Sequence, residues 1–254
     1  MKPLSCLLAL WLVAMAGCSP SENTSSEKTT TATESLTAPA SLLADFALTD
    51  LPYAIDTLLM NRMAKPLATE TAATLFHNVK EAVEYEGGTY YLNRFLYLDS
   101  LYKANPNPTF DIGELVKVKA YALHQWKVSE QALATTVLID FQSYEADPYS
   151  AGQVVVLITC TPEGKPIQSL LVGERSSGGD PPAFGSTLTT AVVNPTQAID
   201  ISEQNESGEF LEDGNADITL TKKQKSYRIQ PNGTIRKESE KELPKENVRK
   251  SMQL

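Results

Sequence analysis

The sequence predicts an α+β domain that is predominantly an antiparallel β meander, sandwich or barrel-like, preceded by a short helical hairpin. Beyond residue 115, apolar residues recur at every second position and turn-forming residues follow at regular intervals, which is typical of antiparallel strands. Between residues 69 and 103, apolar residues recur at helical spacing instead. Residues 154–158 are apolar at every position, which predicts a central strand covered on both faces, with the helical hairpin on one of them.

The helical hairpin is predicted over residues 69–85 and 89–103, on either side of Gly87-Gly88. The first segment has Thr69 as its expected N-cap and the two glycines just past its end. The second segment stops before the Asn-Pro-Asn-Pro run at 105–108, because a residue that precedes proline disfavours helical geometry.

The meander is predicted from nine short strands connected by tight turns. Residues 161–164 and 230–233 each place Pro at the second and Gly at the fourth turn position, which favours a type I hairpin turn. Strands spaced by eight to fifteen residues leave too little chain for crossovers, so consecutive strands are expected to be neighbours. The expected strands are 116–126, 134–142, 153–160, 166–174, 185–193, 198–203, 216–221, 226–230 and 234–237.

The N-terminus carries an export signal. A positive start is followed by thirteen mostly apolar residues, 4–16, which as a helix span about 20 Å and fall short of the roughly 30 Å hydrocarbon core of a bilayer. This length favours a signal peptide over a transmembrane helix. The residues Met15-Ala16-Gly17-Cys18 resemble the lipobox of bacterial lipoproteins, with Met15 where that family most often has Leu.

The lipobox resemblance implies that the Cys18 thiol is alkylated by a diacylglyceryl group and that the signal is cut before Cys18. The expected location is therefore the cell envelope, with a lipid anchor as the membrane contact. In lipoproteins of enteric-type bacteria, a residue other than Asp after the modified cysteine implies the outer membrane, and Ser19 fits that rule. Ordinary secretion with cleavage nearby is the alternative.

Composition divides the chain into four parts. The expected boundaries are a signal peptide at 1–17, a disordered Ser- and Thr-rich lipid-anchored tether at 18–41, a single α+β domain at 42–237 and a charged disordered tail at 238–254. Within the domain, 42–111 is predicted to be mainly helical and 112–237 to be the meander.

Charge and reactive residues exclude several classes of function. A net charge of −9 argues against binding nucleic acid, whose phosphates require a basic surface. His77 and His124 have no spacing typical of metal ligands, and no sequence motif supplies an activated nucleophile, so we expect no metal, no cofactor and no catalytic residue. Cys160 is the one thiol left in a processed chain, and its apolar run predicts burial.

Two loops stand out by composition, 143–152 and 175–184. In an alternating meander both connect strands at the same end of the sheet, so their side chains are expected to be neighbours. The hypothesis is a mixed aromatic and charged recognition surface made of Tyr144, Asp147, Tyr149, Arg175, Asp180 and Phe184. The alternative is that Asp147-Pro148 and Asp180-Pro181 only fix turns.

Residues 50–237 resemble a type of uncharacterised bacterial lipoprotein, through Leu-Pro-Tyr at 51–53, Tyr-Glu-Ala-Asp-Pro-Tyr at 144–149 and Gly-Gly-Asp-Pro-Pro at 178–182. The resemblance implies that the two loops belong to a recurring fold and implies no activity. The function expected is binding of an envelope protein or ligand, with an inhibitor or immunity-type lipoprotein as one alternative. A hydrolase is the other, and two carboxylates about 5 to 10 Å apart in one pocket would favour it; the candidates are Asp140, Glu145, Asp147 and Glu174.

Overall fold

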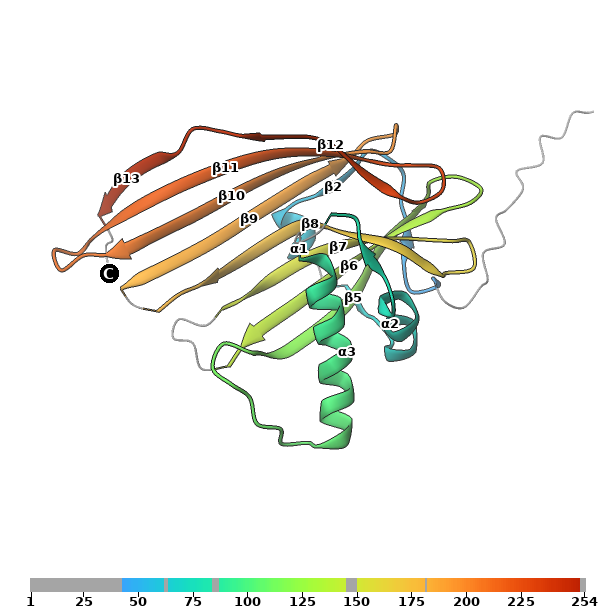
Figure 1. The fold of residues 1–254 in the computed structure, drawn as a ribbon, viewed down its shortest axis with the longest axis horizontal. Helices are drawn as coiled ribbons and strands as arrows, with labels where there is room; N and C mark the ends of the chain where they lie inside the picture. Colours follow the sequence, from blue (N-terminus) through green and yellow to red (C-terminus); the bar gives the residue numbers. More distant parts are fainter. Residues whose placement is uncertain (1–42, 62–63, 84–86, 145–149, 181, 252–254) are drawn as a thin grey trace, which may run out of the picture. The chain divides into compact units, whose positions relative to one another are not determined.

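Figure 1 shows the fold in a computed structural model, which describes residues 43–61, 64–83, 87–144, 150–180 and 182–251. The chain is mostly β with few helices, and its large sheet is mostly antiparallel, which confirms the predicted predominance of antiparallel strands. The predicted signal peptide and tether lie outside the described residues.

The meander consists of strands that follow one another both in sequence and in the sheet, and each pair is antiparallel. A further strand, β13 (Glu246–Ser251), pairs with β11 beside the end of β12. The strands of the meander are β5 (Leu115–Lys127), β6 (Leu133–Ser143), β7 (Ala151–Cys160), β8 (Pro166–Gly178), β9 (Ala183–Val193), β10 (Ala198–Phe210), β11 (Asn215–Ile229) and β12 (Ile235–Glu242).

Four strands of two or three residues precede the meander, in the part predicted to be mainly helical. β1 (Ala47–Leu48) and β3 (Lys65–Pro66) pair with β5, β2 (Tyr53–Ile55) pairs with β9, and β4 (Lys80–Glu81) pairs with β8. Extended chain therefore alternates with helix in this part, because each short strand finds its partner far along the sequence.

The helices differ from the expected hairpin. A short helix, α1 (Thr57–Met60), precedes α2 (Thr69–Phe76) and α3 (Gly88–Ala104). α2 ends nine residues before the predicted position, because the chain beyond it forms β4, and the backbone N–H of Ala82 donates to the carbonyl of Ser169 on β8. A segment of extended chain thus replaces the expected tight connection at Gly87-Gly88, while the two helices still contact each other through the rings of Phe76 and Phe95, whose centroids lie 5.7 Å apart.

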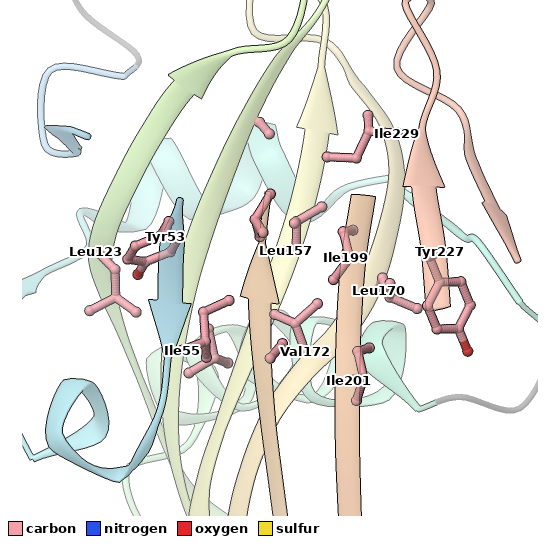
Figure 2. Close-up of a cluster of buried hydrophobic side chains, with 14 of the residues drawn as sticks. Tyr53, Ile55, Leu123, Leu157, Leu170, Val172, Ile199, Ile201, Tyr227 and Ile229 are labelled. Carbon is pink, nitrogen blue, oxygen red and sulfur yellow. The ribbon is translucent and has the colours of Figure 1, made fainter. Parts of the chain in front are cut away.

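β7 is the central strand, as its continuous apolar run predicts, and both of its faces are buried. Val154, Val156 and Ile158 point to one core, which α2 and α3 cover. Val155 and Leu157 point to a second core, where side chains of β5 to β8 meet side chains of β9 to β12. Figure 2 shows Leu157 and Val172 in this second core beside Ile199 and Ile201 of β10.

The two predicted hairpin turns are confirmed. Gly164 and Gly233 each donate a 2.8 Å backbone hydrogen bond to the first residue of the turn, Thr161 and Gln230, and each has a φ near +80°. Glycine adopts this left-handed conformation without the steric cost that a Cβ atom imposes. Each turn thus has the geometry of a type I turn followed by a left-handed residue.

The predicted disordered tail is wrong for residues 238–251. β12 continues to Glu242 and β13 follows, so this charged segment lies along the edge of the sheet. Its charges face opposite charges on β11: Lys223 pairs with Glu242 at 3.1 Å and Lys222 pairs with Glu246 at 3.0 Å. β11 is also one strand where the sequence predicts two, 216–221 and 226–230.

Candidate functional site

The two loops of the predicted recognition surface do lie beside each other. A Cβ atom on Gly178 would lie 2.9 Å from the Cα atom of Ser150, so the β8–β9 and β6–β7 connections meet. Asp147 and Tyr149 lie outside the described residues.

The described members of that surface contact different elements. Tyr144 packs near Phe110, with ring centroids 6.3 Å apart. Arg175 donates a 3.0 Å hydrogen bond to Asn61 at the end of α1. Phe184 stacks on Phe210 at the far end of β10, with ring centroids 4.6 Å apart.

Asp180 is exposed, and its carbonyl accepts a hydrogen bond from the Ala183 N–H, which suits a turn. Tyr144, Arg175 and Phe184 thus contact Phe110, Asn61 and Phe210, which lie in three different parts of the chain. The shared recognition surface therefore stays a prediction.

A different site lies on one face of β9, β10 and β11. Because side chains alternate along a strand, Ile199, Ile201, Glu203 and Asn205 of β10 all point to the same face. The first two residues belong to the second core, whereas Glu203 and Asn205 line a cavity of about 380 Å³. The cavity therefore begins where the second core ends on this face of β10.

We call the cavity that Glu203 and Asn205 line the charged cavity, and its walls combine a small apolar surface with many polar groups. Leu171 of β8 and Ile201 supply the apolar surface. Charged and polar side chains supply the remainder: Glu174, Thr187, Thr189, Glu203, Asn205, Lys223, Lys225 and Glu240. Cross-strand register sets this arrangement, because Glu174, Thr189, Glu203 and Lys223 are successive partners across β8 to β11.

Glu203 is the centre of a hydrogen-bond network. Its Oε1 accepts from Asn205 Nδ2 at 2.7 Å, and its Oε2 lies 3.0 Å from the ammonium nitrogen of Lys225. Thr187 Oγ1 in turn donates to Asn205 Oδ1 at 2.9 Å. Only 10% of the Lys225 side chain and 19% of the Glu203 side chain are exposed, so this ion pair is largely shielded from water.

Of the three carboxylates that line the cavity, Glu174 and Glu203 have pKa values shifted in opposite directions. Burial raises the pKa of Glu174, and the charge of Glu203 raises it further, against the hydrogen bond from Ser176 Oγ at 2.5 Å. Burial alone would also raise the pKa of Glu203, but the hydrogen bonds from Asn205 and Lys225 and the nearby lysine charges lower it below its usual range. Among the described residues, no salt bridge to Glu174 is found.

Of the other carboxylates considered from the sequence, Asp140 lies in a separate pocket of about 300 Å³ with Tyr121 and Gln153. Burial raises the pKa of Tyr121, and Asp140 adds to the shift through its charge and a hydrogen bond. Glu145 and Asp147 lie outside the described residues. Asp140 and Glu174 thus line different cavities.

His77, His124 and Cys160 are placed as ordinary surface or core residues. His124 Nδ1 lies 3.0 Å from the hydroxyl oxygen of Tyr53, and His77 is exposed at the end of α2. Cys160 is fully buried, as predicted, and burial raises the pKa of its thiol to about 12. Within the described ranges, no group of three His, Cys, Asp or Glu side chains is arranged to hold a metal ion.

Of the residues that line the cavity, the sequence pointed only to Glu174, as a candidate carboxylate of a hydrolase, and it gave no indication of Glu203, Asn205, Lys223 and Lys225. A signal for them exists, because the pairs 203/205 and 223/225 are polar residues at strand spacing that continue the apolar faces of Ile201 and Tyr227. The local sequence does not show how β10 and β11 are aligned, and this alignment is what places the two pairs side by side.

No family model, no curated protein and no solved structure matches the chain. The resemblance to bacterial lipoproteins and the envelope location therefore stay predictions from the sequence. In the part of the chain that the structure describes, no helix has both the length and the apolar character needed to cross a bilayer.

Proposed function

We propose that this chain is a lipid-anchored protein of the bacterial envelope that acts by binding, and that the charged cavity binds a small polar molecule carrying one ammonium group. The observation that carries the proposal is the state of Glu174. Its carboxylate is buried beside Glu203 without a salt bridge among the described residues, whereas Lys225 is committed to Glu203 and Lys223 to Glu242. A ligand cation next to Glu174 would supply the missing counter-charge.

The rest of the cavity supports the same ligand class. Leu171 and Ile201 offer a small apolar surface, and Thr187, Thr189 and Asn205 offer hydroxyl and amide groups for hydrogen bonds. A cavity of about 380 Å³ falls in the range used by small-molecule sites. On this proposal the meander acts as a sandwich-like scaffold whose open end holds the ligand.

Isothermal titration calorimetry with two probes that each carry one ammonium group, glucosamine and 5-aminopentan-1-ol, tests the ligand class. Glucose and pentane-1,5-diol are their uncharged counterparts. We expect at least one ammonium probe to bind at pH 7 and both uncharged counterparts to bind at least tenfold more weakly. Glu174→Gln should reduce binding of the ammonium probe at least tenfold, while Glu212→Gln, which changes an exposed carboxylate in a turn, should leave it unchanged. Equal binding by the wild type and Glu174→Gln, or no binding of either ammonium probe, would overturn the proposal.

A second candidate function, acid–base hydrolysis, rests on the opposite pKa shifts of Glu174 and Glu203. A carboxyl group with a raised pKa donates a proton and one with a lowered pKa stays ionised, which is how paired carboxylates divide their work in glycosidases. Release of nitrophenol from p-nitrophenyl glycosides, with a bell-shaped pH profile that Glu174→Gln abolishes, would favour this candidate. A flat profile at the buffer rate would leave binding as the function.

The lipid anchor has its own test. If Cys18 carries the lipid, Cys18→Ser should move the exported protein from the membrane fraction to the soluble fraction. Persistence of exported Cys18→Ser protein in the membrane fraction would contradict the anchor.

A further inference from the structure

A groove runs between α3 and the edge of β5, away from the charged cavity. It has a volume of about 690 Å³, and four consecutive residues of β5, Val116 to Lys119, line it. Successive side chains of a strand point to opposite faces of the sheet, so a groove that touches all four must follow the edge of the strand. Figure 1 shows α3 beside this end of β5.

The edge of β5 is covered along one stretch and open along the next. β1 pairs with His124 and Gln125, and β3 pairs with Tyr121 and Ala122. The covering ends where the backbone N–H of Leu67 donates to the carbonyl of Ala120 at 2.9 Å, after which the chain turns into α2. No described strand pairs with residues 116–119 on this side.

The backbone of Val118 faces the groove. Ala120 directs its carbonyl to the β3 side, and the residue two positions before it in a regular strand directs its N–H and carbonyl the same way. The register between β5 and β6 is regular from Lys117 to Ala122, so this alternation holds at Val118. At the far end of the groove, the Tyr102 hydroxyl donates to the Val116 carbonyl at 3.0 Å. An open edge of this kind is a template for an additional strand.

The side chains of the groove are sorted by face. Phe95 and Leu98 of α3 and Val118 form an apolar surface on the helix side. Lys117 and Lys119 are exposed on the other side, and neither takes part in a salt bridge within the described residues. Lys103 pairs with Asp99 at 2.7 Å, so the lining keeps a net positive charge in a chain whose net charge is −9.

We infer that the edge of β5 beside α3 binds an extended acidic segment of a partner protein by β-strand addition. The backbone of Val118 hydrogen-bonds to the added strand. The residue opposite Val118 is apolar and points to the helix side, and its two neighbours are acidic and face Lys117 and Lys119. Backbone bonds would supply affinity, and the alternation of acidic and apolar side chains would supply specificity. This surface is independent of the charged cavity and of its ligand.

The test uses the full processed chain in detergent and a labelled heptapeptide of alternating Glu and Val, measured by fluorescence anisotropy. We expect Lys117→Glu/Lys119→Glu to weaken peptide binding at least tenfold. Lys165→Glu, which reverses an exposed lysine in the turn between β7 and β8, should leave it within twofold. Raising the salt concentration from 50 to 500 mM should also weaken binding.

A second measurement separates strand addition from charge attraction alone and does not alter the protein. N-methylation of the peptide at its Val residues removes the N–H groups that face β5, and this should abolish binding. N-methylation at its Glu residues removes N–H groups that face away from β5 and should be tolerated. Equal loss or equal retention in the two peptides would overturn strand addition. If sedimentation shows a dimer that Lys117→Glu/Lys119→Glu converts to a monomer, a second copy of this chain occupies the edge and the proposed partner is wrong.

Discussion

One face of β9 to β11 carries two different surfaces within a few residues. At one end Ile199 and Tyr227 are fully buried in the second core, and at the other end Glu203 and Lys225 line the charged cavity. The change falls between Ile201 and Glu203 on β10 and between Tyr227 and Lys225 on β11. The strands themselves are continuous, so the difference arises from what packs on top of them.

The comparison teaches how a long strand can serve both a core and a binding site. Under a covering layer, apolar side chains gain stability by leaving water. Beyond the second core, a partly buried charge is costly unless it is paired. Glu203 is paired with Lys225 and accepts a hydrogen bond from Asn205. The following predictions separate these two contributions.

The largest effect is expected at the covered end. Ile199→Ala removes a fully buried side chain from the second core and should lower the free energy of unfolding by about 3 kcal/mol. Urea denaturation followed by circular dichroism measures the change. Ser202→Ala, an exposed position on the opposite face of the same strand, is the control and should change stability by less than about 0.5 kcal/mol. A similar loss in both variants would mean that the covered end is not the stabilising part of this face.

The next effect is expected at the shielded ion pair. Lys225→Met leaves the Glu203 carboxylate without its cation in a site that is mostly closed to water, and should cost about 2 kcal/mol. The double variant Lys225→Met/Glu203→Gln removes both charges and should recover at least half of this loss. No recovery in the double variant would show that Lys225 stabilises through packing of its chain and not through its charge.

A smaller effect of opposite sign is expected at Glu174. A carboxyl group whose folded pKa is raised opposes folding once it ionises, so stability should fall as the pH rises from its ordinary pKa of 4.5 through the raised value. Glu174→Gln keeps an acceptor for Ser176 and removes this cost. It should raise stability at pH 7 by about 1 kcal/mol, with the gain vanishing near pH 4. A variant that is less stable than the wild type at pH 7 would contradict the direction of the shift.

The smallest effect is expected two residues from Lys225. Lys223 pairs with Glu242 at 3.1 Å, but 33% of the lysine side chain and 68% of the glutamate side chain are exposed. Because water and salt screen such pairs, Lys223→Met should cost no more than about 0.5 kcal/mol, and the loss should disappear in 0.5 M salt. A loss equal to that of Lys225→Met would remove burial as the reason for the difference between the two lysines.

Features that depend on neighbours in sequence could be predicted. The turns at 161–164 and 230–233 form because Pro and Gly fix their conformations locally. The apolar run of β7 identified a strand buried on both faces, since such a run has no face to expose to water. These two signals account for the order of strands in the central part of the sheet.

Features that depend on distant partners could not be predicted. Residues 238–251 have the composition of a solvated tail, yet they form strands because their backbone pairs with β11, where opposite charges face each other. Lys80 and Glu81 continue a helical pattern, yet they pair with β8. The charged cavity was missed for the same reason, because Glu203 and Lys225 meet only through the register of β10 with β11.

The burial of Cys160 has a chemical consequence for the mature chain. A thiol that is fully buried and has a pKa of about 12 is protonated and out of reach of alkylating reagents at neutral pH. Cys18 is the other cysteine left once residues 1–17 are removed. Maleimide labelling of the folded, processed protein would therefore report the fraction of molecules whose Cys18 thiol has escaped alkylation by the diacylglyceryl group, without any engineered cysteine.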